Sequence, residues 1–265
     1  MFDTEETELG LDSVFTEPPR PPSPAPTTVI YKREARDDTQ DWSEITIRLV
    51  GSHPLWGHYL WNASRAFASY LDTHPELYRD RAVLELGAGG GLPGIVAAKN
   101  GARTVVLTDY PDACLIDNLE FNVYNNAPSA SKKLQSVQGY IWGHPVGPLL
   151  EHLRRDSSAT GFDLIIMSDL IFNHSQHDAL LRTCEETLLP RTSEGLEPCL
   201  LVFYTHHRPH LAHRDMEFFS KAQERGWRCE EVVTQSFPAS PMFPEDPGDK
   251  EVRATVHGWQ LTRRS

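Results

Sequence analysis

The sequence predicts an α/β domain on a doubly wound sheet that is mostly parallel and has one reversed edge strand. Short apolar runs alternate with helical segments from about residue 46 onward. The last two apolar runs, 229–235 and 252–262, are separated only by a loop rich in Pro and Gly, with no room for a helix. We therefore expect an antiparallel hairpin at the end of the chain. A length of 265 residues suits a single domain of this class.

The predicted elements follow in a regular order. Apolar side chains at helical spacing predict a helix over 55–73, and the run 82–86 is typical of a buried strand that enters a tight turn. A helix over 92–100 is expected to stop at Gly101, and Pro111 is expected in the first turn of a helix over 111–124. The remaining predictions are strands at 104–108, 162–167 and 199–204 and helices at 175–189 and 212–226.

The first forty residues differ in composition from the rest. They begin with a run of acidic residues that meets no basic residue before Arg20, and six prolines follow between positions 18 and 26. Such a segment is not expected to form a helix or a sheet ladder. We predict an acidic, Pro-rich tail over 1–40 and a folded domain over 41–265. The tail is either disordered with polyproline II character or a flap that closes over a substrate.

Charge and cysteine usage limit the location and the partners. The chain has 25 Lys and Arg against 37 Asp and Glu, a net charge of −12, which argues against a general nucleic-acid binder and fits a basic partner. Four scattered cysteines indicate reduced thiols, and neither a secretory signal nor an apolar run of membrane-spanning length is found. We expect a monomeric cytoplasmic protein with no membrane or nucleic-acid partner.

The stretch Glu85-Leu86-Gly87-Ala88-Gly89-Gly90-Gly91-Leu92 is the most informative one. Glycines between a strand and a helix let the backbone approach a ligand beside the positive end of the helix. The dinucleotide fingerprint G-x-G-x-x-G fails because position 92 is Leu. Glu85 would repel a pyrophosphate but could pair with an ammonium, and Asp109, after the next strand, can hold a ribose diol. S-adenosylmethionine offers these partners without a phosphate.

Several motifs together resemble a known enzyme family. They are V-L-E-L-G-A-G-G-G-L-P-G (83–94), L-W-N-A-S (60–64), L-T-D-Y (107–110), N-L-E-F-N (118–122), I-W-G (141–143) and D-L-I-I-M-S-D-L-I-F-N-H (163–174). This set resembles methyltransferase family 16, seven-strand enzymes that depend on S-adenosylmethionine, many of which methylate protein lysines. The resemblance covers residues 47–262 and implies a seven-strand methyltransferase sheet with helices on both faces.

A closer resemblance reaches into the tail. The segments E-P-P-R-P-P-S-P (17–24), Y-K-R (31–33), L-V-G-S-H-P-L-W-G-H (49–58) and T-H-H-R-P (205–209) look like those of fungal enzymes that methylate translation elongation factor 1-alpha. This resemblance implies transfer to the amine of the N-terminal glycine, exposed after Met removal, and to the adjacent lysine.

The resemblance also assigns roles to residues. Asp169 and Phe172 occupy an Asp-x-x-aromatic motif beside the acceptor amine, where many relatives have Tyr in place of Phe. Without the resemblance, Asp169 could equally satisfy backbone donors at a helix N-terminus, and Phe172 could pack in the core. The expected cofactor-binding residues are Trp61, Glu85, Gly87, Ala88, Gly89, Asp109, Tyr110, Trp142 and Ser168.

The histidines and the substrate leave alternatives open. His206, His207, His210 and His213 cluster as metal ligands can, but Pro209 interrupts them and methyl transfer needs no metal, so no metal is expected. His206 to Arg208 could instead line the substrate mouth. The glycine turn reads only the cofactor, so another protein lysine, a small amine such as nicotinamide, or a non-catalytic adaptor with this fold remain alternatives.

Overall fold

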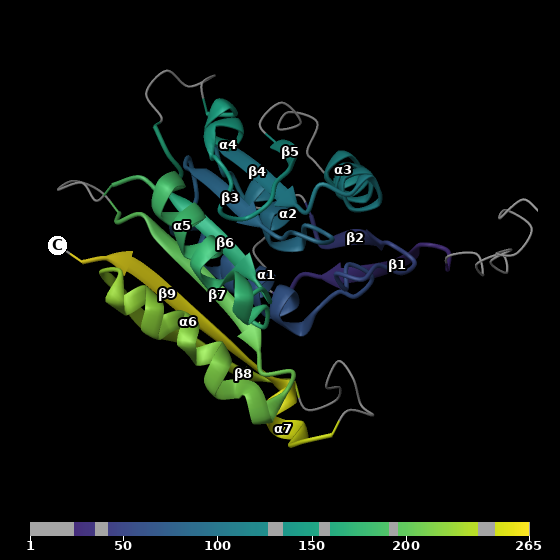
Figure 1. The fold of residues 1–265 in the computed structure, drawn as a ribbon. Coiled ribbons are helices and arrows are strands. Elements are labelled where there is room, and N and C mark those ends of the chain that lie inside the picture. The colour runs from purple at the N-terminus through teal and green to yellow at the C-terminus, as the bar shows by residue number, and fades with distance from the viewer. Residues whose placement is uncertain are drawn as a thin grey trace, which may run out of the picture.

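A seven-stranded sheet of order β5-β4-β3-β6-β7-β9-β8 forms the centre of the protein (Figure 1). The computed structural model describes residues 24–34, 42–126, 135–153, 160–190, 196–237 and 247–264. The strands are β3 (Ala82–Leu86), β4 (Thr104–Asp109), β5 (Gln135–Gly139), β6 (Leu164–Ser168), β7 (Cys199–Thr205), β8 (Trp227–Ser236) and β9 (Thr255–Arg263).

The strand pairing confirms the predicted fold class. Strands β5, β4, β3, β6 and β7 pair in parallel, and β9 runs antiparallel to both β7 and β8. The reversed strand β9 is therefore the second strand from the edge of the sheet. It pairs with the edge strand β8, and the two form the predicted terminal hairpin. The chain leaves β3 to build outward through β4 and β5 and then returns to β6 on the other side of β3. Such a reversal opens a crevice at the carboxyl ends of the strands.

Helices cover both faces of the sheet, as the alternation of elements predicts. On one face, α1 (Asn62–Thr73), α2 (Leu92–Lys99) and α3 (Ala113–Asn126) enclose a buried core with side chains such as Phe67, Ile95 and Phe203. On the other face, α4 (Gly147–Glu151), α5 (His177–Thr187) and α6 (Ala212–Glu224) enclose a second core with Leu149, Leu181 and Phe218. Because β6 and β7 are buried on both faces, they read as nearly continuous apolar runs.

Several predicted helix boundaries are wrong. The helix expected over 55–73 begins only at Asn62, because Pro54 and Gly57 interrupt the preceding segment and Trp56 has a left-handed φ of 63°. The segment 52–61 is therefore a loop, and it lines a large cavity at the carboxyl edge of the sheet. Pro111 lies before α3, which begins at Ala113, rather than in its first turn.

Short elements without a strong periodic signal account for the other differences. Turns of 3₁₀ helix, η2 (Pro75–Leu77), η3 (His174–Gln176) and η4 (Pro209–Leu211), precede β3, α5 and α6. A short helix, α7 (Lys250–Ala254), lies between β8 and β9, where a strand and a loop were expected. Asp249 caps it by accepting hydrogen bonds from the N–H groups of Glu251 and Val252.

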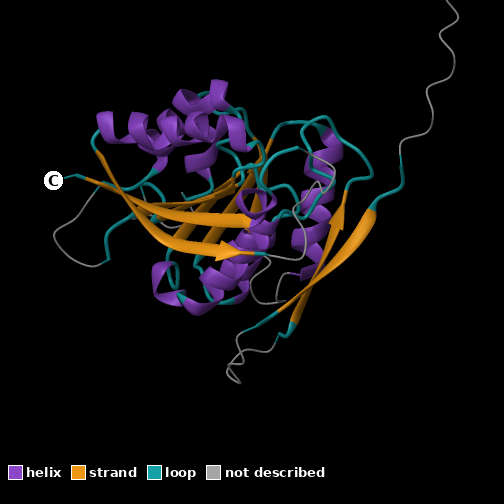
Figure 2. Cartoon of the chain, turned by 90° about the horizontal axis from the view of Figure 1, so that it is seen from below, coloured by secondary structure: helices purple, strands orange, loops and turns teal. Residues whose placement is uncertain are grey.

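An antiparallel hairpin of β1 (Thr27–Lys32) and β2 (Glu44–Leu49) lies apart from the main sheet (Figure 2). Residues 27–32 fall in the tail that was predicted to form no sheet ladder, so that prediction is wrong for them. They are rich in Thr, Val, Ile and Tyr, which favour strands, but the prolines before them dominate the composition of the segment. The acidic and Pro-rich stretch up to residue 23 lies outside the described residues.

Asparagine side chains of α3 attach β2 to the domain. The Asn122 amide accepts a hydrogen bond from Arg48 N–H at 2.8 Å and donates one to Arg48 C=O at 2.8 Å. Asn126, one turn further on, makes the same pair of bonds with Thr46. Each amide substitutes for a neighbouring strand, so the open edge of β2 is satisfied without another strand.

A buried ion pair fixes the other side of the hairpin. Arg33 Nε donates to both carboxylate oxygens of Asp72 in α1 at 2.9 and 2.7 Å, and both side chains are nearly inaccessible to solvent. Asn100 Nδ2 donates to the same carboxylate at 2.8 Å.

None of the helices in the described ranges is both long enough and apolar enough to cross a membrane.

Asp72→Asn should lower the free energy of unfolding by about 3 kcal/mol, because it leaves the buried Arg33 guanidinium without its carboxylate. Urea denaturation measures this loss. The matched control is Asp178→Asn, which removes an exposed carboxylate that pairs with Lys221 and Arg225 and should cost less than about 1 kcal/mol. Equal losses in the two variants would contradict the structural role of the buried pair.

Candidate active site

A cavity of about 870 Å³ opens at the carboxyl edge of the sheet, at the strand reversal beside β3. Its walls come from the segments that follow four neighbouring parallel strands and from the loop 52–61. The glycine turn follows β3, Asp109 and Tyr110 end β4, Trp142 follows β5, and Ser168 to Asn173 follow β6. Elements far apart in the sequence therefore meet where a doubly wound sheet binds its ligand.

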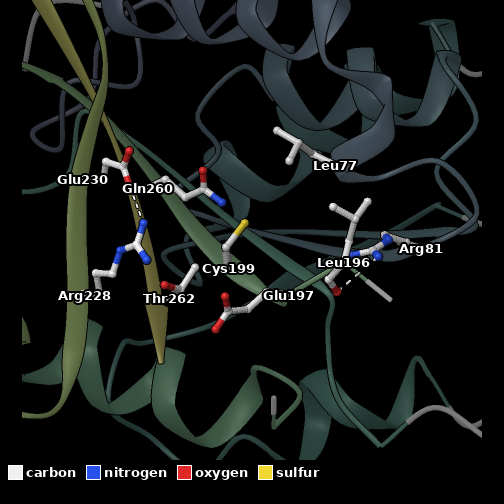
Figure 3. A pocket seen from close by; sticks show the side chains of 9 residues that line it. All are labelled: Leu77, Arg81, Leu196, Glu197, Cys199, Arg228, Glu230, Gln260 and Thr262. Carbon is white, nitrogen blue, oxygen red and sulfur yellow. Dashed lines mark hydrogen bonds and ion pairs between the residues drawn. The ribbon is translucent and has the colours of Figure 1, made fainter. Parts of the chain in front are cut away.

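A smaller hollow at the opposite edge of the sheet has none of these features (Figure 3). It lies at the amino ends of β3 and β7, between Arg81 and Cys199, and has a volume of about 160 Å³. Two of its arginines are engaged by neighbouring groups: Arg228 pairs with Glu230 at 2.6 Å, and Arg81 donates a hydrogen bond to Leu196 C=O.

The glycine turn presents bare backbone to the main cavity. Gly87 and Gly89 have left-handed φ values of 58° and 55°, which favour glycine. A Cβ on Gly87 would lie 2.5 Å from Leu170 Cδ2, whereas a Cβ on Gly89 would meet no atom within 4 Å. The open space at Gly89 belongs to the cavity. The turn thus leaves room for a group of the ligand to lie against the main chain.

Asp109 closes the turn from the end of β4. Its Oδ2 accepts a hydrogen bond from Gly89 N–H at 2.7 Å, and its Oδ1 accepts one from Tyr110 N–H at 2.7 Å. Burial raises the pKa of Asp109, and these two N–H groups and His53 oppose that rise by favouring the carboxylate. The carboxylate is held rigidly at the cavity wall, where a ribose diol can donate to it.

Glu85 lies apart from the cavity, contrary to the expectation that it pairs with a cofactor ammonium. Its side chain is fully buried on the face of β3 that meets α2, and its Oε2 accepts a hydrogen bond from Gly94 N–H at 2.9 Å. Its Oε1 has no hydrogen-bond partner among the described residues. Burial raises the pKa of Glu85 to about 8, and the Coulombic effect of Asp109 acts in the same direction. Glu85 therefore joins β3 to α2 beneath the glycine turn, outside the residues that line the cavity.

The hairpin supports the turn from outside. Ile47 of β2 packs against Gly90, where an added Cβ would lie 2.6 Å from Ile47 Cγ2. Asn122, which holds the backbone of Arg48, also donates to Gly90 C=O at 3.1 Å. Strand β2 of the hairpin thus helps to fix the glycine turn.

Asp169 has a strained backbone at the end of β6. Its φ of 58° is left-handed, which is uncommon for a residue other than glycine and is concentrated at functional sites. Its N–H donates to Phe203 C=O at 2.7 Å, which fixes this conformation. The Oδ1 accepts from Thr205 N–H at 3.3 Å and bonds His207 Nε2 at 2.9 Å. The buried Oδ2 has no partner among the described residues and is left for an incoming donor.

Two adjacent histidines after β7 hold the loop that carries Asp169. His207 bonds Asp169 directly, and its ring meets Trp61 edge-on with 4.9 Å between centroids. His206 Nδ1 bonds Asp215 at 2.7 Å, and the other oxygen of Asp215 bonds His174 Nε2 at 2.7 Å. Two members of the predicted histidine cluster, His206 and His207, therefore pair with two different carboxylates. No set of three metal-ligating side chains gathers anywhere in the described ranges.

Ten of the eleven predicted site residues line the cavity, and Glu85 is the exception. The ten are Trp61, Gly87, Ala88, Gly89, Asp109, Tyr110, Trp142, Ser168, Asp169 and Phe172. Sequence reasoning did not assign Trp56, Tyr140 and Asn173, which also line it. Tyr140 could have been found, since it directly follows a strand end. Trp56 could not, because its place depends on a loop where a helix was expected.

The described side chains fit S-adenosylmethionine. The bare backbone at Gly89 and the fixed carboxylate of Asp109 suit an uncharged ribose, and neither the turn nor its neighbours place a cation for a pyrophosphate. Trp142 lines the same cavity next to Gly87. The donor set and the space agree with a nucleoside.

Comparison with known proteins identifies the family. A family model described as lysine methyltransferase matches residues 40–225. The chain belongs to this family. It is an S-adenosylmethionine-dependent protein methyltransferase.

The most similar relatives cover nearly the whole chain. A protein N-terminal and lysine N-methyltransferase, EFM7, of Cryptococcus neoformans is 47% identical over 274 residues, covering 98% of this chain and 90% of that protein. The efm7 protein of Schizosaccharomyces pombe is 45% identical over 252 residues and covers 94% of each chain.

Solved structures support the fold. A protein of Streptococcus mutans described as a SAM-dependent methyltransferase superposes with a TM-score of 0.51 at 13% identity, covering 82% of this chain and 53% of that one. A protein of Pyrococcus horikoshii described as an RNA methyltransferase has a TM-score of 0.50 at 17% identity, covering 81% and 90%. At these identities the likeness establishes the sheet and its helices only.

Glu85→Gln should separate a positioning role from cofactor contact. The pKa of Glu85 is raised above its unfolded value of 4.5, so the native state keeps a proton that the unfolded chain has lost. The wild type should therefore lose about 1.4 kcal/mol of unfolding free energy per unit between about pH 5.5 and pH 7.5. The Gln variant should lack this slope, as urea denaturation at each pH measures.

The same variant should bind S-adenosylhomocysteine within about threefold of wild-type affinity, because Gln can still accept from Gly94 N–H. A direct ion pair with the cofactor would instead cost about tenfold or more. Isothermal titration distinguishes the two. A large loss of S-adenosylhomocysteine affinity with unchanged stability would show that Glu85 contacts the cofactor directly.

Proposed function

We propose that this enzyme transfers methyl groups from S-adenosylmethionine to the N-terminal glycine amine and the adjacent lysine of translation elongation factor 1-alpha. The names of the relatives support an N-terminal and a lysine amine as acceptors. The segments 17–24, 31–33, 49–58 and 205–209 support elongation factor 1-alpha as the substrate, through their resemblance to fungal enzymes that modify it. The proposal includes a monomeric enzyme, since residues of a single chain line the main cavity. It also includes a cytoplasmic location, since the scattered cysteines indicate reduced thiols.

The observation that carries the proposal is the unpartnered Oδ2 of Asp169. A buried carboxylate oxygen without a donor is costly, and a substrate amine that donates to it would remove that cost. Its other oxygen is already held by His207 and Thr205 N–H, so the carboxylate cannot turn away. Asp169 can therefore hold an amine in one orientation.

Bound S-adenosylmethionine would supply a methyl group on a positively charged sulfur. The protein's own task is alignment and desolvation of the amine. A free α-amine has a pKa of about 8 and a lysine amine one of about 10.4, so the amine must lose a proton before it attacks. Asp169 accepts a hydrogen bond from the neutral amine and so directs its lone pair away from the carboxylate.

Aromatic side chains surround the position of the amine. Phe172 is 44% exposed and Trp56 is 40% exposed, and both line the cavity together with Trp61. Aromatic faces stabilise a methylated ammonium by cation–π attraction. Phe172 cannot hydrogen-bond the amine as a Tyr would, which leaves space for more than one methyl group.

Asp169→Asn should lower kcat for methyl transfer by about a hundredfold or more, because the amide offers no full negative charge to the amine. Asn tolerates the left-handed conformation, so the fold should be kept. The assay is mass spectrometry of elongation factor 1-alpha with an unmethylated N-terminus, incubated with S-adenosylmethionine. Methyl groups should appear on the terminal glycine and the adjacent lysine.

S-adenosylhomocysteine affinity is the control and should change by less than about threefold in the variant. Normal turnover by Asp169→Asn would contradict the role of Asp169. If the wild type binds the cofactor normally but does not methylate elongation factor 1-alpha, the assignment as a methyltransferase stands and this substrate is rejected. Another protein lysine, or a small amine, would then be the acceptor to test.

A further inference from the structure

A second cavity of about 440 Å³ adjoins the cofactor cavity. The two share a wall made by Trp56, Trp61, Phe172 and Asn173. Since Phe172 and Trp61 flank the predicted position of the amine, the second cavity begins where the acceptor would lie. A polypeptide whose amine reaches Asp169 has this space for the residues that follow.

Two arginines give the second cavity its chemistry. Arg208 follows β7 and Arg214 lies in the first turn of α6, and both line the cavity with exposed side chains. Neither guanidinium has a hydrogen bond or an ion pair within the described ranges. In a chain with a net charge of −12, carboxylate partners are plentiful elsewhere, as Arg225 shows by pairing with Asp178 and Glu185.

The carboxylate that lines the same cavity does not neutralise these arginines. Asp215 is buried, and its two oxygens bond His174 Nε2 and His206 Nδ1 at 2.7 Å each. Both oxygens are thus occupied on the inner side of the cavity. The two guanidiniums remain available to a ligand, and their planar forks match a carboxylate.

We propose that the second cavity is a recognition site for a carboxylate side chain of the protein substrate, a few residues after the acceptor amine. The site rests on the proposed function, since it requires a peptide acceptor. It extends that function by giving the substrate two points of attachment. The acceptor amine binds Asp169, and an acidic side chain a few residues later binds Arg208 and Arg214. The same arginines repel a substrate lysine from this cavity.

The test uses peptides that begin Gly-Lys and carry a single Glu at the third, fourth, fifth or sixth position of an otherwise neutral sequence. Each has a partner peptide with Gln in place of Glu. At one position, the wild type should show a kcat/KM about tenfold higher for Glu than for Gln. Fluorescence anisotropy with labelled peptides and enzyme saturated with S-adenosylhomocysteine should show the same preference in affinity.

The double variant Arg208→Gln and Arg214→Gln should bring the Glu-to-Gln ratio close to one in both assays. The matched control is Arg182→Gln, an exposed arginine of α5 outside both cavities, which should keep the wild-type ratio. A ratio that survives in the double variant would overturn the proposal. So would equal kcat/KM and affinity for Glu and Gln peptides at every position, because the arginines would then bind backbone carbonyls.

The two readouts distinguish this proposal from the proposed function. If no peptide is methylated, the proposed function fails on this substrate, and the anisotropy ratio still decides whether the arginines bind a carboxylate. If peptides are methylated without a Glu preference, the function holds and the recognition site is rejected.

Discussion

The hydrogen bond from Gly94 N–H to the buried carboxyl of Glu85 is the interaction on which the cofactor site depends. It joins the central strand β3 to α2, and the glycine turn between them therefore has fixed ends. A Cβ on Gly94 would lie 2.4 Å from Glu85 Oε2, so the contact requires glycine at that position. With its ends fixed, the turn can carry left-handed glycines, of which Gly89 donates its N–H to Asp109. A protonated Glu85 suits this place, because a charged one would be buried without a cation.

A second constraint acts on the acceptor side of the cavity. Asp169 keeps a left-handed backbone because its N–H is bound to Phe203 C=O and its side chain is held from the end of β7. His207 and His206 hold the β6 loop at two points, one directly and one through Asp215 and His174. The contacts from β7 and the residues after it thus hold the strained backbone of Asp169. In this conformation Oδ1 is bound and Oδ2 has no partner among the described residues. Such an arrangement is preorganised, which suits a reaction that mainly needs alignment.

Much of this site follows from the sequence for physical reasons. Parallel strands place their carboxyl ends at one edge of the sheet, so Asp109 and Asp169, which follow apolar runs in the sequence, line the same cavity. Glu85 lies outside the cavity lining because side chains alternate along β3, where Glu85 shares the face of Val83 that packs toward α2. The resemblance to a family gave a role to the residue but not the direction of its side chain.

The missed features depend on contacts that no local pattern contains. The hairpin β1–β2 is stabilised by α3 asparagines and by the Arg33–Asp72 pair, which come from distant positions. The loop 52–61 carries apolar residues at helical spacing, yet Pro54, Gly57 and the left-handed Trp56 make it a wall of both cavities. In the hairpin, tertiary contacts outweighed the Pro-rich composition of the segment before it. In the loop, they outweighed the helical spacing of its apolar residues.

We propose that the main cavity aligns a cofactor held by the glycine turn with an amine held by Asp169. A crystal structure with S-adenosylhomocysteine and an N-terminal peptide of elongation factor 1-alpha tests it most directly. The account predicts the ribose on Asp109, the glycine amine within hydrogen-bond distance of Asp169 Oδ2, and the next residues in the second cavity. A peptide amine bound away from Asp169, or a nucleoside outside the carboxyl edge of the sheet, would contradict it.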